Sequence, residues 1–325
     1  MEISWTAPGA CWNQLGIEPR ARCDKSVSPQ TTVSVSDTRL SWSDPRKGQL
    51  FSLAVLTSLV VVMYAPVLSP MARQWWSDPN YGHALLVPVF VAYVLWRERA
   101  RWQAVPTLAS DSGFLIMLLA VGLLLLGMLS AELFTARVSL IILISGMVVF
   151  LAGWRMVRSI AFPLGYLMFM IPLPALVYYQ LTFPLQLWAS RLGAYGLVML
   201  GVHTLRHGNL LILPNATLEV VEACSGVRSL LSLLAAVVAY GYLTEQSMWK
   251  RCLLVALTIP VVILSNGLRL VAAGVLSFVY GPGVDSGPAH ALLGLAFFGL
   301  AFLSILLIHR ALRYIPNRWN STLTN

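Results

Sequence analysis

The fold class is decided by residues 113–131, GFLIMLLAVGLLLLGMLSA, which carry no charged side chain. A helix that crosses the hydrocarbon core of a bilayer needs about 20 largely apolar residues, so this run predicts a transmembrane helix. The whole chain shares this character, because 58% of its 325 residues are hydrophobic and 11% are charged, and its mean hydropathy is +0.74. This balance excludes a soluble globular protein.

Further apolar runs lie on both sides of this segment, and together they predict an all-α polytopic membrane protein of about eight transmembrane helices. The expected spans lie at about residues 49–68, 82–96, 113–131, 138–153, 159–173, 225–243, 252–278 and 290–309. Residues 174–200 are also apolar enough to cross, but prolines and polar side chains interrupt them, so we expect an interfacial or re-entrant helix there.

A short extracytoplasmic hairpin is expected between the fifth and sixth spans. The expected strands are Leu210-Leu-Ile-Leu and Leu218-Glu-Val-Val, and a Pro-Asn-Ala-Thr turn separates them. This pattern predicts two short strands.

The basic residues predict how the chain crosses the membrane. Most of the 22 Lys and Arg fall in the N-terminal tail and in loops on one side of the predicted spans, so the positive-inside rule puts both termini in the cytoplasm. Residues 1–47 are polar and have no apolar period, which predicts a disordered cytoplasmic tail without a signal peptide. Residues 48–310 form the expected membrane domain, and residues 311–325 a short cytoplasmic tail. Because the basic residues occur in short groups between apolar runs, we expect no nucleic-acid partner.

Ionisable residues at span ends are functional candidates, because they are costly in a bilayer. The predicted topology places Cys224, Arg269 and His290 on one membrane face. A thiol at a helix N-terminus near positive charge would have its thiolate favoured, which makes Cys224 a plausible nucleophile. His290 could pair with the thiolate and then protonate a leaving amine, and Arg269 could stabilise an oxyanion or hold the substrate.

Less specific interpretations stay open for each of these residues. A lone Cys at a helix end is usually a small buried hydrophobe. Glu222 could orient His290, although pairing with Arg228 is the simpler interpretation, and a structural hydrogen bond explains Asn266 as well as catalysis does. The five histidines show no convincing set of metal ligands, so no metal and no cofactor is expected.

Six short motifs, in this order along residues 75–310, resemble the exosortases, membrane proteins proposed to be cysteine transpeptidases. The motifs are Trp76-Ser-Asp-Pro-Asn-Tyr-Gly-His83, Phe162-Pro-Leu with Ile171-Pro-Leu-Pro174, Gly208-Asn-Leu, Glu222-Ala-Cys-Ser-Gly-Val-Arg-Ser229, Asn266-Gly-Leu-Arg269 and Ala289-His290. The resemblance implies a catalytic set of Cys224, Arg269 and His290. It also implies supporting or substrate-binding roles for Asp78, His83 and Arg228.

The resemblance further implies a thiol protease or transpeptidase of the bacterial inner membrane with a periplasmic active site. The expected partners are secreted proteins with a C-terminal Pro-Glu-Pro sorting signal (PEP-CTERM), an envelope amine acceptor and membrane lipids, and the expected context is exopolysaccharide production. A non-catalytic component of polysaccharide export remains the alternative. That role makes no demand on Cys224.

Overall fold

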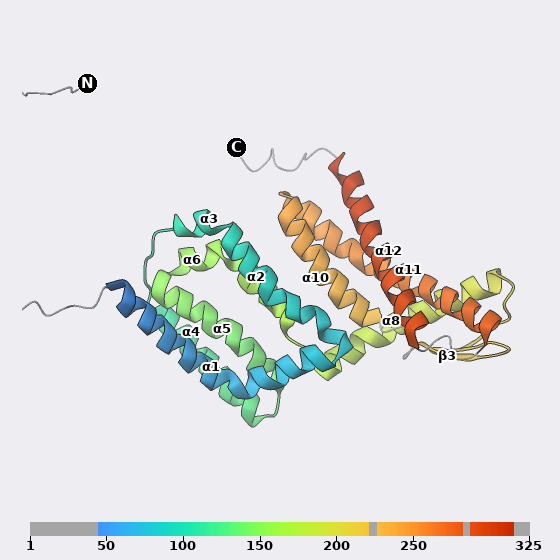
Figure 1. Cartoon of the computed structure of the whole chain (residues 1–325), viewed down its shortest axis with the longest axis horizontal. Helices are drawn as coiled ribbons and strands as arrows, with labels where there is room; N and C mark the ends of the chain where they lie inside the picture. Colours follow the sequence, from blue (N-terminus) through green and yellow to red (C-terminus); the bar gives the residue numbers. More distant parts are fainter. Residues whose placement is uncertain (1–44, 221–225, 282–286, 315–325) are drawn as a thin grey trace, which may run out of the picture. The chain divides into compact units, whose positions relative to one another are not determined.

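The structure is a computed structural model that describes residues 45–220, 226–281 and 287–314. The chain divides into two compact units, Met1–Leu56 and Thr57–Asn325, and the following description concerns the second. Helices dominate it, and a small sheet lies between α8 and α10 in sequence (Figure 1).

The elements follow one another in a simple order. In the first half of the chain they are α1 (Pro45–Ser77), η1 (Pro79–Leu85), α2 (Leu86–Arg97), α3 (Arg99–Gln103), α4 (Ser112–Leu129), α5 (Leu133–Ala152), α6 (Trp154–Ser159), α7 (Ala161–Tyr166) and η2 (Leu167–Met170). In the second half they are α8 (Ala175–Met199), β1 (Leu205–His207), β2 (Leu210–Ile212), β3 (Thr217–Glu219), α10 (Gly226–Thr244), α11 (Met248–Tyr280) and α12 (Gly287–Arg313).

The described residues contain five helices long and apolar enough to cross a membrane, or six if a bent helix pair forms one span. The chain is therefore an all-α polytopic membrane protein, but the predicted count of eight spans is not confirmed. The span expected at 159–173 is broken into α6, α7 and η2. The break before α8 has a local cause, because Pro172 and Pro174 lack a backbone N–H and disfavour helical geometry in the residues before them.

The hairpin of α4 and α5 is closely packed and has a well-defined turn. Ala131 adopts a left-handed conformation with φ 55°, and Glu132 caps α5 by accepting a 2.7 Å hydrogen bond from the Thr135 backbone N–H. Hydrogen bonds from Thr135 lower the pKa of the Glu132 carboxyl, and the bond from the Thr135 side chain has a larger effect than the bond from its backbone. The carboxylate thus replaces the missing partners of the first amides of the helix.

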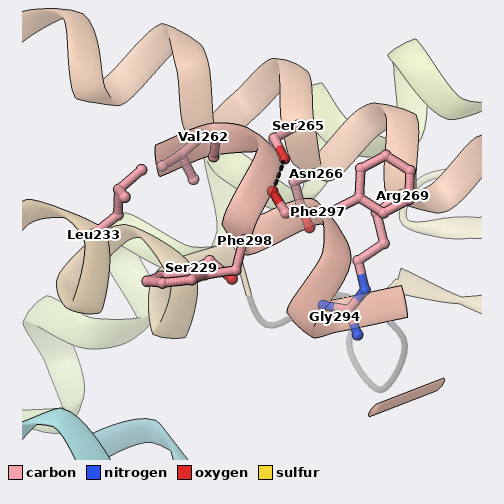
Figure 2. Close-up of a pocket in the computed structure, with 10 residues that line it drawn as sticks. Ser229, Leu233, Val262, Ser265, Asn266, Arg269, Gly294, Phe297 and Phe298 are labelled. Carbon is pink, nitrogen blue, oxygen red and sulfur yellow. Dashed lines mark hydrogen bonds between the residues drawn. The ribbon is translucent and has the colours of Figure 1, made fainter. Parts of the chain in front are cut away.

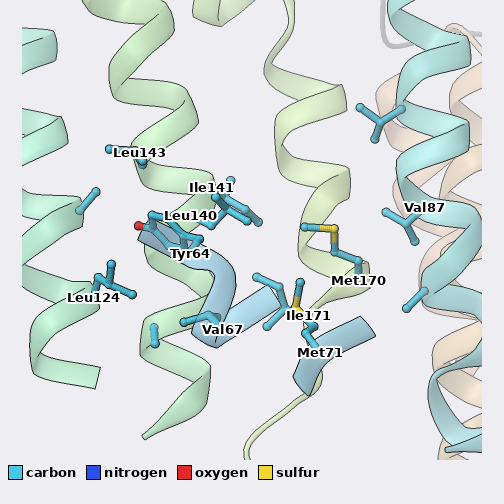
Figure 3. Close-up of a cluster of buried hydrophobic side chains, with 14 of the residues drawn as sticks. Tyr64, Val67, Met71, Val87, Leu124, Leu140, Ile141, Leu143, Met170 and Ile171 are labelled. Atoms are coloured by element: carbon cyan, nitrogen blue, oxygen red, sulfur yellow. The ribbon is translucent and has the colours of Figure 1, made fainter. Parts of the chain in front are cut away.

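One hydrophobic core joins α1, α2, α4, α5 and η2 (Figure 3). Tyr64 of α1 is fully buried in this core, and its hydroxyl makes a 2.9 Å hydrogen bond with Ser139 of α5. The buried hydroxyls therefore satisfy each other, as burial in an apolar core requires.

Helices α8 and α11 approach each other through alternating small and large residues. A Cβ atom placed on Gly193 of α8 would lie 2.6 Å from Leu270 of α11, and one placed on Gly267 of α11 would lie 2.8 Å from Leu192 of α8. Each glycine thus accommodates a leucine of the other helix.

Residues 161–170 and α8 are bent by 80° relative to each other, as a broken span or a re-entrant segment requires.

The predicted two-stranded hairpin is a three-stranded antiparallel sheet in the order β1-β2-β3. Gly208, with φ 66°, lies in the short turn between β1 and β2, where a left-handed residue matches the strand twist. Leu211 and Leu218 are fully buried in a cluster with residues of α8 and α11. The sheet is therefore anchored to these helices.

Candidate active site

A small pocket lies where α10, α11 and α12 meet (Figure 2). Its walls combine four polar side chains with aliphatic and aromatic ones. The lining residues are Ser229, Leu233, Val262, Ser265, Asn266, Arg269, Gly294, Phe297, Phe298 and Ala301. The predicted candidates Arg269 and Asn266 therefore share one pocket, and both come from the Asn266-Gly-Leu-Arg269 motif.

Arg269 is partly buried and its guanidinium lies against Gly294 of α12. A Cβ atom on Gly294 would be 3.3 Å from Nη2 of Arg269 and 3.4 Å from its Cζ. This is closer than ordinary van der Waals contact, so the glycine makes room for the guanidinium. Gly294 is four residues after His290 in α12, which places position 290 one helical turn away on the same helix face.

A second contact fixes the spacing of α11 and α12 beside this arginine. The Ser265 hydroxyl of α11 donates a 2.8 Å hydrogen bond to the backbone carbonyl of Phe297 in α12, drawn in Figure 2. Asn266 is buried, with 6% of its surface exposed, and lies one turn before Arg269. The two helices are therefore joined at the level of the pocket.

Three predicted residues are not placed by the structure. Glu222 and Cys224 lie outside the described residues, and the side chain of His290 does as well, although its backbone belongs to α12. The surrounding elements are described. Helix α10 begins at Gly226, two residues after Cys224, and Ser229 in its first turns lines the same pocket as Arg269.

The first sequence motif packs against the beginning of α10. The Asp78 carboxylate caps η1 by accepting a 2.9 Å hydrogen bond from the backbone N–H of Asn80. The Asn80 side-chain oxygen in turn accepts a 3.1 Å hydrogen bond from Nε of Arg228. Asp78 is thus a structural cap in this arrangement. It fixes the backbone of Asn80, whose side chain binds Arg228.

His83 makes the second link between η1 and α10. Its Nδ1 lies 3.2 Å from the hydroxyl of Ser232, one turn after Arg228. The structure therefore joins two motifs that are almost 150 residues apart in the chain. His83 of η1 thus contacts α10, the helix that carries Arg228, whereas Asn266 and Arg269 lie on α11.

Sequence reasoning did not single out Asn80, Ser232 or Gly294. Asn80 lies within a quoted motif, so its polar side chain beside Asp78 was an available signal. Ser232 and Gly294 gave none, because a serine or a glycine in an apolar helix is ordinary in membrane proteins.

The pocket offers donors for developing negative charge. A guanidinium is always charged and has five N–H groups in a planar fork, so Arg269 can bind a carboxylate or an oxyanion. The apolar walls from α10 and α12 reduce competition from water, which strengthens such contacts. The arrangement is typical of a site that stabilises an anion, in the substrate or in a reaction intermediate.

Comparison with known families identifies the family of the chain. The family model of the transmembrane exosortases matches residues 75–307, from just before the first motif to the end region of α12. The chain belongs to the transmembrane exosortase family. No curated protein and no solved structure matches the chain. All six motifs on which the resemblance rests lie inside the matched range of this exosortase.

Proposed function

We propose that this exosortase is a thiol-dependent peptidase or transpeptidase that processes C-terminal sorting signals of secreted proteins. The observation that carries the proposal is the position of Arg269. Its guanidinium lies against Gly294, one turn from position 290, in a pocket that Ser229 near the Cys224 end of α10 also lines. Helices α10, α11 and α12 thus meet at this pocket, and the three candidate residues all lie within the family match.

The reaction has two steps. The Cys224 thiolate attacks the carbonyl carbon of the scissile peptide bond, so that a C–S bond forms and the C–N bond breaks. His290, as an imidazolium, gives its proton to the leaving amine, and the acyl group remains on sulfur as a thioester. Water or an amine of an envelope acceptor then attacks the thioester. His290 takes up the proton of this nucleophile, and the thiolate is released.

Arg269 acts on the oxygen that becomes negative in both steps. Its guanidinium donates hydrogen bonds to the tetrahedral oxyanion, a contribution typically worth about 100- to 1,000-fold in rate for a well-placed donor. Asn266, one turn earlier, and Arg228, held by Asn80, are supporting residues. In this proposal both chain termini are cytoplasmic and the site faces the periplasm. The substrates carry a Pro-Glu-Pro signal, and the activity is linked to exopolysaccharide production.

The test is co-expression with a tagged secreted protein that ends in a Pro-Glu-Pro sorting signal. The wild type should shorten the tagged product, and Cys224→Ala should abolish the shortening. Cys252→Ala is the matched control, because Cys252 is an exposed free cysteine in the first turns of α11, far along that helix from Arg269. It should process as the wild type does.

Two results decide between the proposal and a non-catalytic role. Processing that survives in Cys224→Ala at the wild-type level, with normal membrane levels of the variant, would remove the thiol from the mechanism. Loss in both cysteine variants would indicate damage to folding and would contradict a specific role for Cys224. Arg269→Gln should retain folding and lower the processing rate by about 100-fold.

A further inference from the structure

A second pocket lies at the opposite end of the same helices. It has a volume of about 440 Å³, within the range of about 300–1,000 Å³ that is usual for small-ligand sites. One residue of α10 and five of the last turns of α12 line it, and they combine leucines with basic and aromatic side chains. These residues are Tyr240, Leu306, Leu307, His309, Arg310 and Arg313.

One wall of this pocket is held rigid by a buried chain of hydrogen bonds. His309 is 1% exposed, and its Nδ1 lies 2.7 Å from the Tyr240 hydroxyl. Its Nε2 lies 3.4 Å from the Glu245 carboxylate, whose other oxygen accepts hydrogen bonds from two backbone amides of the α10–α11 connection. Both ring nitrogens of His309 therefore have a polar partner, one on α10 and one in the α10–α11 connection.

Two arginines of the pocket carry a permanent positive charge. Arg310 and Arg313 are three residues apart on α12 and therefore share a face. Both are exposed, and neither forms an ion pair with any residue that the structure describes. Glu245, the carboxylate at this end of the helices, is already bound to His309 and to backbone amides. The pocket thus has two adjacent guanidiniums, and neither pairs with a carboxylate of the residues that the structure describes.

The apolar surface beside the arginines identifies the kind of ligand. Leu300, Leu303 and Leu307 recur at helical spacing along α12 and are 45%, 50% and 59% exposed. This strip ends at the pocket, which Leu307 lines. A ligand with an anionic head and an apolar tail matches both features, because arginine binds phosphate oxygens well and a membrane helix exposes leucine to acyl chains.

We propose that this pocket binds an anionic phospholipid, with Arg310 and Arg313 contacting the headgroup phosphate and the tail lying along the α12 leucines. The pocket lies at the end of α12 that faces the Lys250–Arg251 side of the chain, the side predicted to be cytoplasmic. Membrane leaflets on that side are rich in anionic lipid in many cells. The proposal does not depend on the thiol chemistry, so a Cys224→Ala variant should bind lipid normally.

The experiment measures phosphatidylglycerol bound to the purified full-length protein in detergent, by native mass spectrometry across a lipid titration. Each basic residue near an anionic lipid is worth about a fivefold change in affinity, so Arg310→Gln with Arg313→Gln should weaken binding about 25-fold. Arg155→Gln with Arg158→Gln is the matched control. These two arginines are also exposed and three apart, but they lie on α6 outside this pocket. Their replacement should leave the affinity nearly unchanged.

Further arms separate the possible ligands. Phosphatidylcholine, which has no net charge, should bind much more weakly than phosphatidylglycerol to the wild type. Inorganic phosphate at millimolar concentration should not displace the lipid, and displacement would assign the pocket to free phosphate instead. Arg310→Lys with Arg313→Lys keeps both charges and should retain most of the affinity. Equal losses in the α12 and α6 glutamine pairs would overturn the proposal, because they would indicate general attraction of lipid to basic surface.

Discussion

Gly294→Ala is the most informative single change, because it replaces a hydrogen by a methyl group directly beside the Arg269 guanidinium. The new Cβ would lie 3.3 Å from Nη2 and 3.4 Å from Cζ. The guanidinium must therefore shift by a few tenths of an ångström, while the backbone of α12 can stay in place. A displacement of about 1 Å of a catalytic group can cost about 100-fold, so a shift of this size should lower processing roughly three- to tenfold.

The same substitution should not destabilise the protein. Alanine is favoured over glycine within a helix by about 1 kcal/mol, and the contact falls on the end of a flexible side chain. Gly299→Ala is the matched control, because Gly299 lies in the same helix and its Cβ would meet nothing within 4 Å. Both variants should have equal or slightly higher thermal stability than the wild type in detergent.

The assay compares initial rates of processing of the tagged substrate with thermal unfolding of the same preparations. A lower rate in Gly294→Ala, with stability matching that of Gly299→Ala, would show that the position of the Arg269 guanidinium matters for the reaction. Equal rates in the two variants would refute this reasoning, since the guanidinium would then tolerate displacement. Arg269 would in that case have no positional role in the reaction.

Three further outcomes follow from the packing. Glu132→Ala should lower the free energy of unfolding by about 1 kcal/mol through loss of the α5 cap. Because the pKa of Glu132 is lowered in the folded protein, the stabilisation by its carboxylate is complete above the ordinary carboxyl pKa and disappears as pH falls through the lowered pKa. Thermal unfolding of the wild type and the variant at neutral and acid pH measures this difference. Gly193→Ala should destabilise by about 1–2 kcal/mol, because its Cβ would lie 2.6 Å from the fully buried Leu270, and a thermal midpoint at or above that of the wild type would contradict the close contact of α8 and α11. Alanine replacements of His83 and Ser232, singly and together, should show a coupling energy of about 1 kcal/mol in a double-mutant cycle, whereas additive effects would mean that η1 is not joined to α10 by this hydrogen bond.

The long helices could be predicted from sequence because their signal is local. The runs expected at 113–131 and 252–278 correspond to α4 and α11, with small shifts at their ends. The run expected at 159–173 is interrupted in the structure, and average apolarity does not report such helix breaks. Its prolines were visible, but their effect depends on whether neighbouring elements satisfy the backbone groups that are set free.

The third strand was also missed, for a related reason. Leu205–His207 is short and has one apolar residue, and its pairing with Leu210–Ile212 depends on the left-handed Gly208 between them. Period-2 alternation cannot be recognised over three residues. The strand exists because its partner is anchored by buried Leu211 to the neighbouring helices.

The candidate site shows the same division between local and non-local information. The sequence alone marks Arg269 as unusual, because a charged side chain inside an apolar span is energetically costly in a bilayer. What it contacts could not be inferred, since Gly294 lies on another helix and carries no side chain that would mark it. The link from His83 to Ser232 joins residues 149 apart, and neither residue alone indicates the other.

Helix α12 connects the two sites and also keeps them apart. Gly294 and Arg310 are 16 residues apart in one continuous helix, which at 1.5 Å per residue corresponds to about 24 Å, close to the roughly 30 Å thickness of a bilayer core. A headgroup bound at Arg310 is therefore too distant to contact Arg269 directly. The position of α12 is one route by which the lipid can affect processing. Since Gly294 sets the space for the Arg269 guanidinium, a small shift of that helix would change the site, and lipid at one end could in this way tune the reaction at the other.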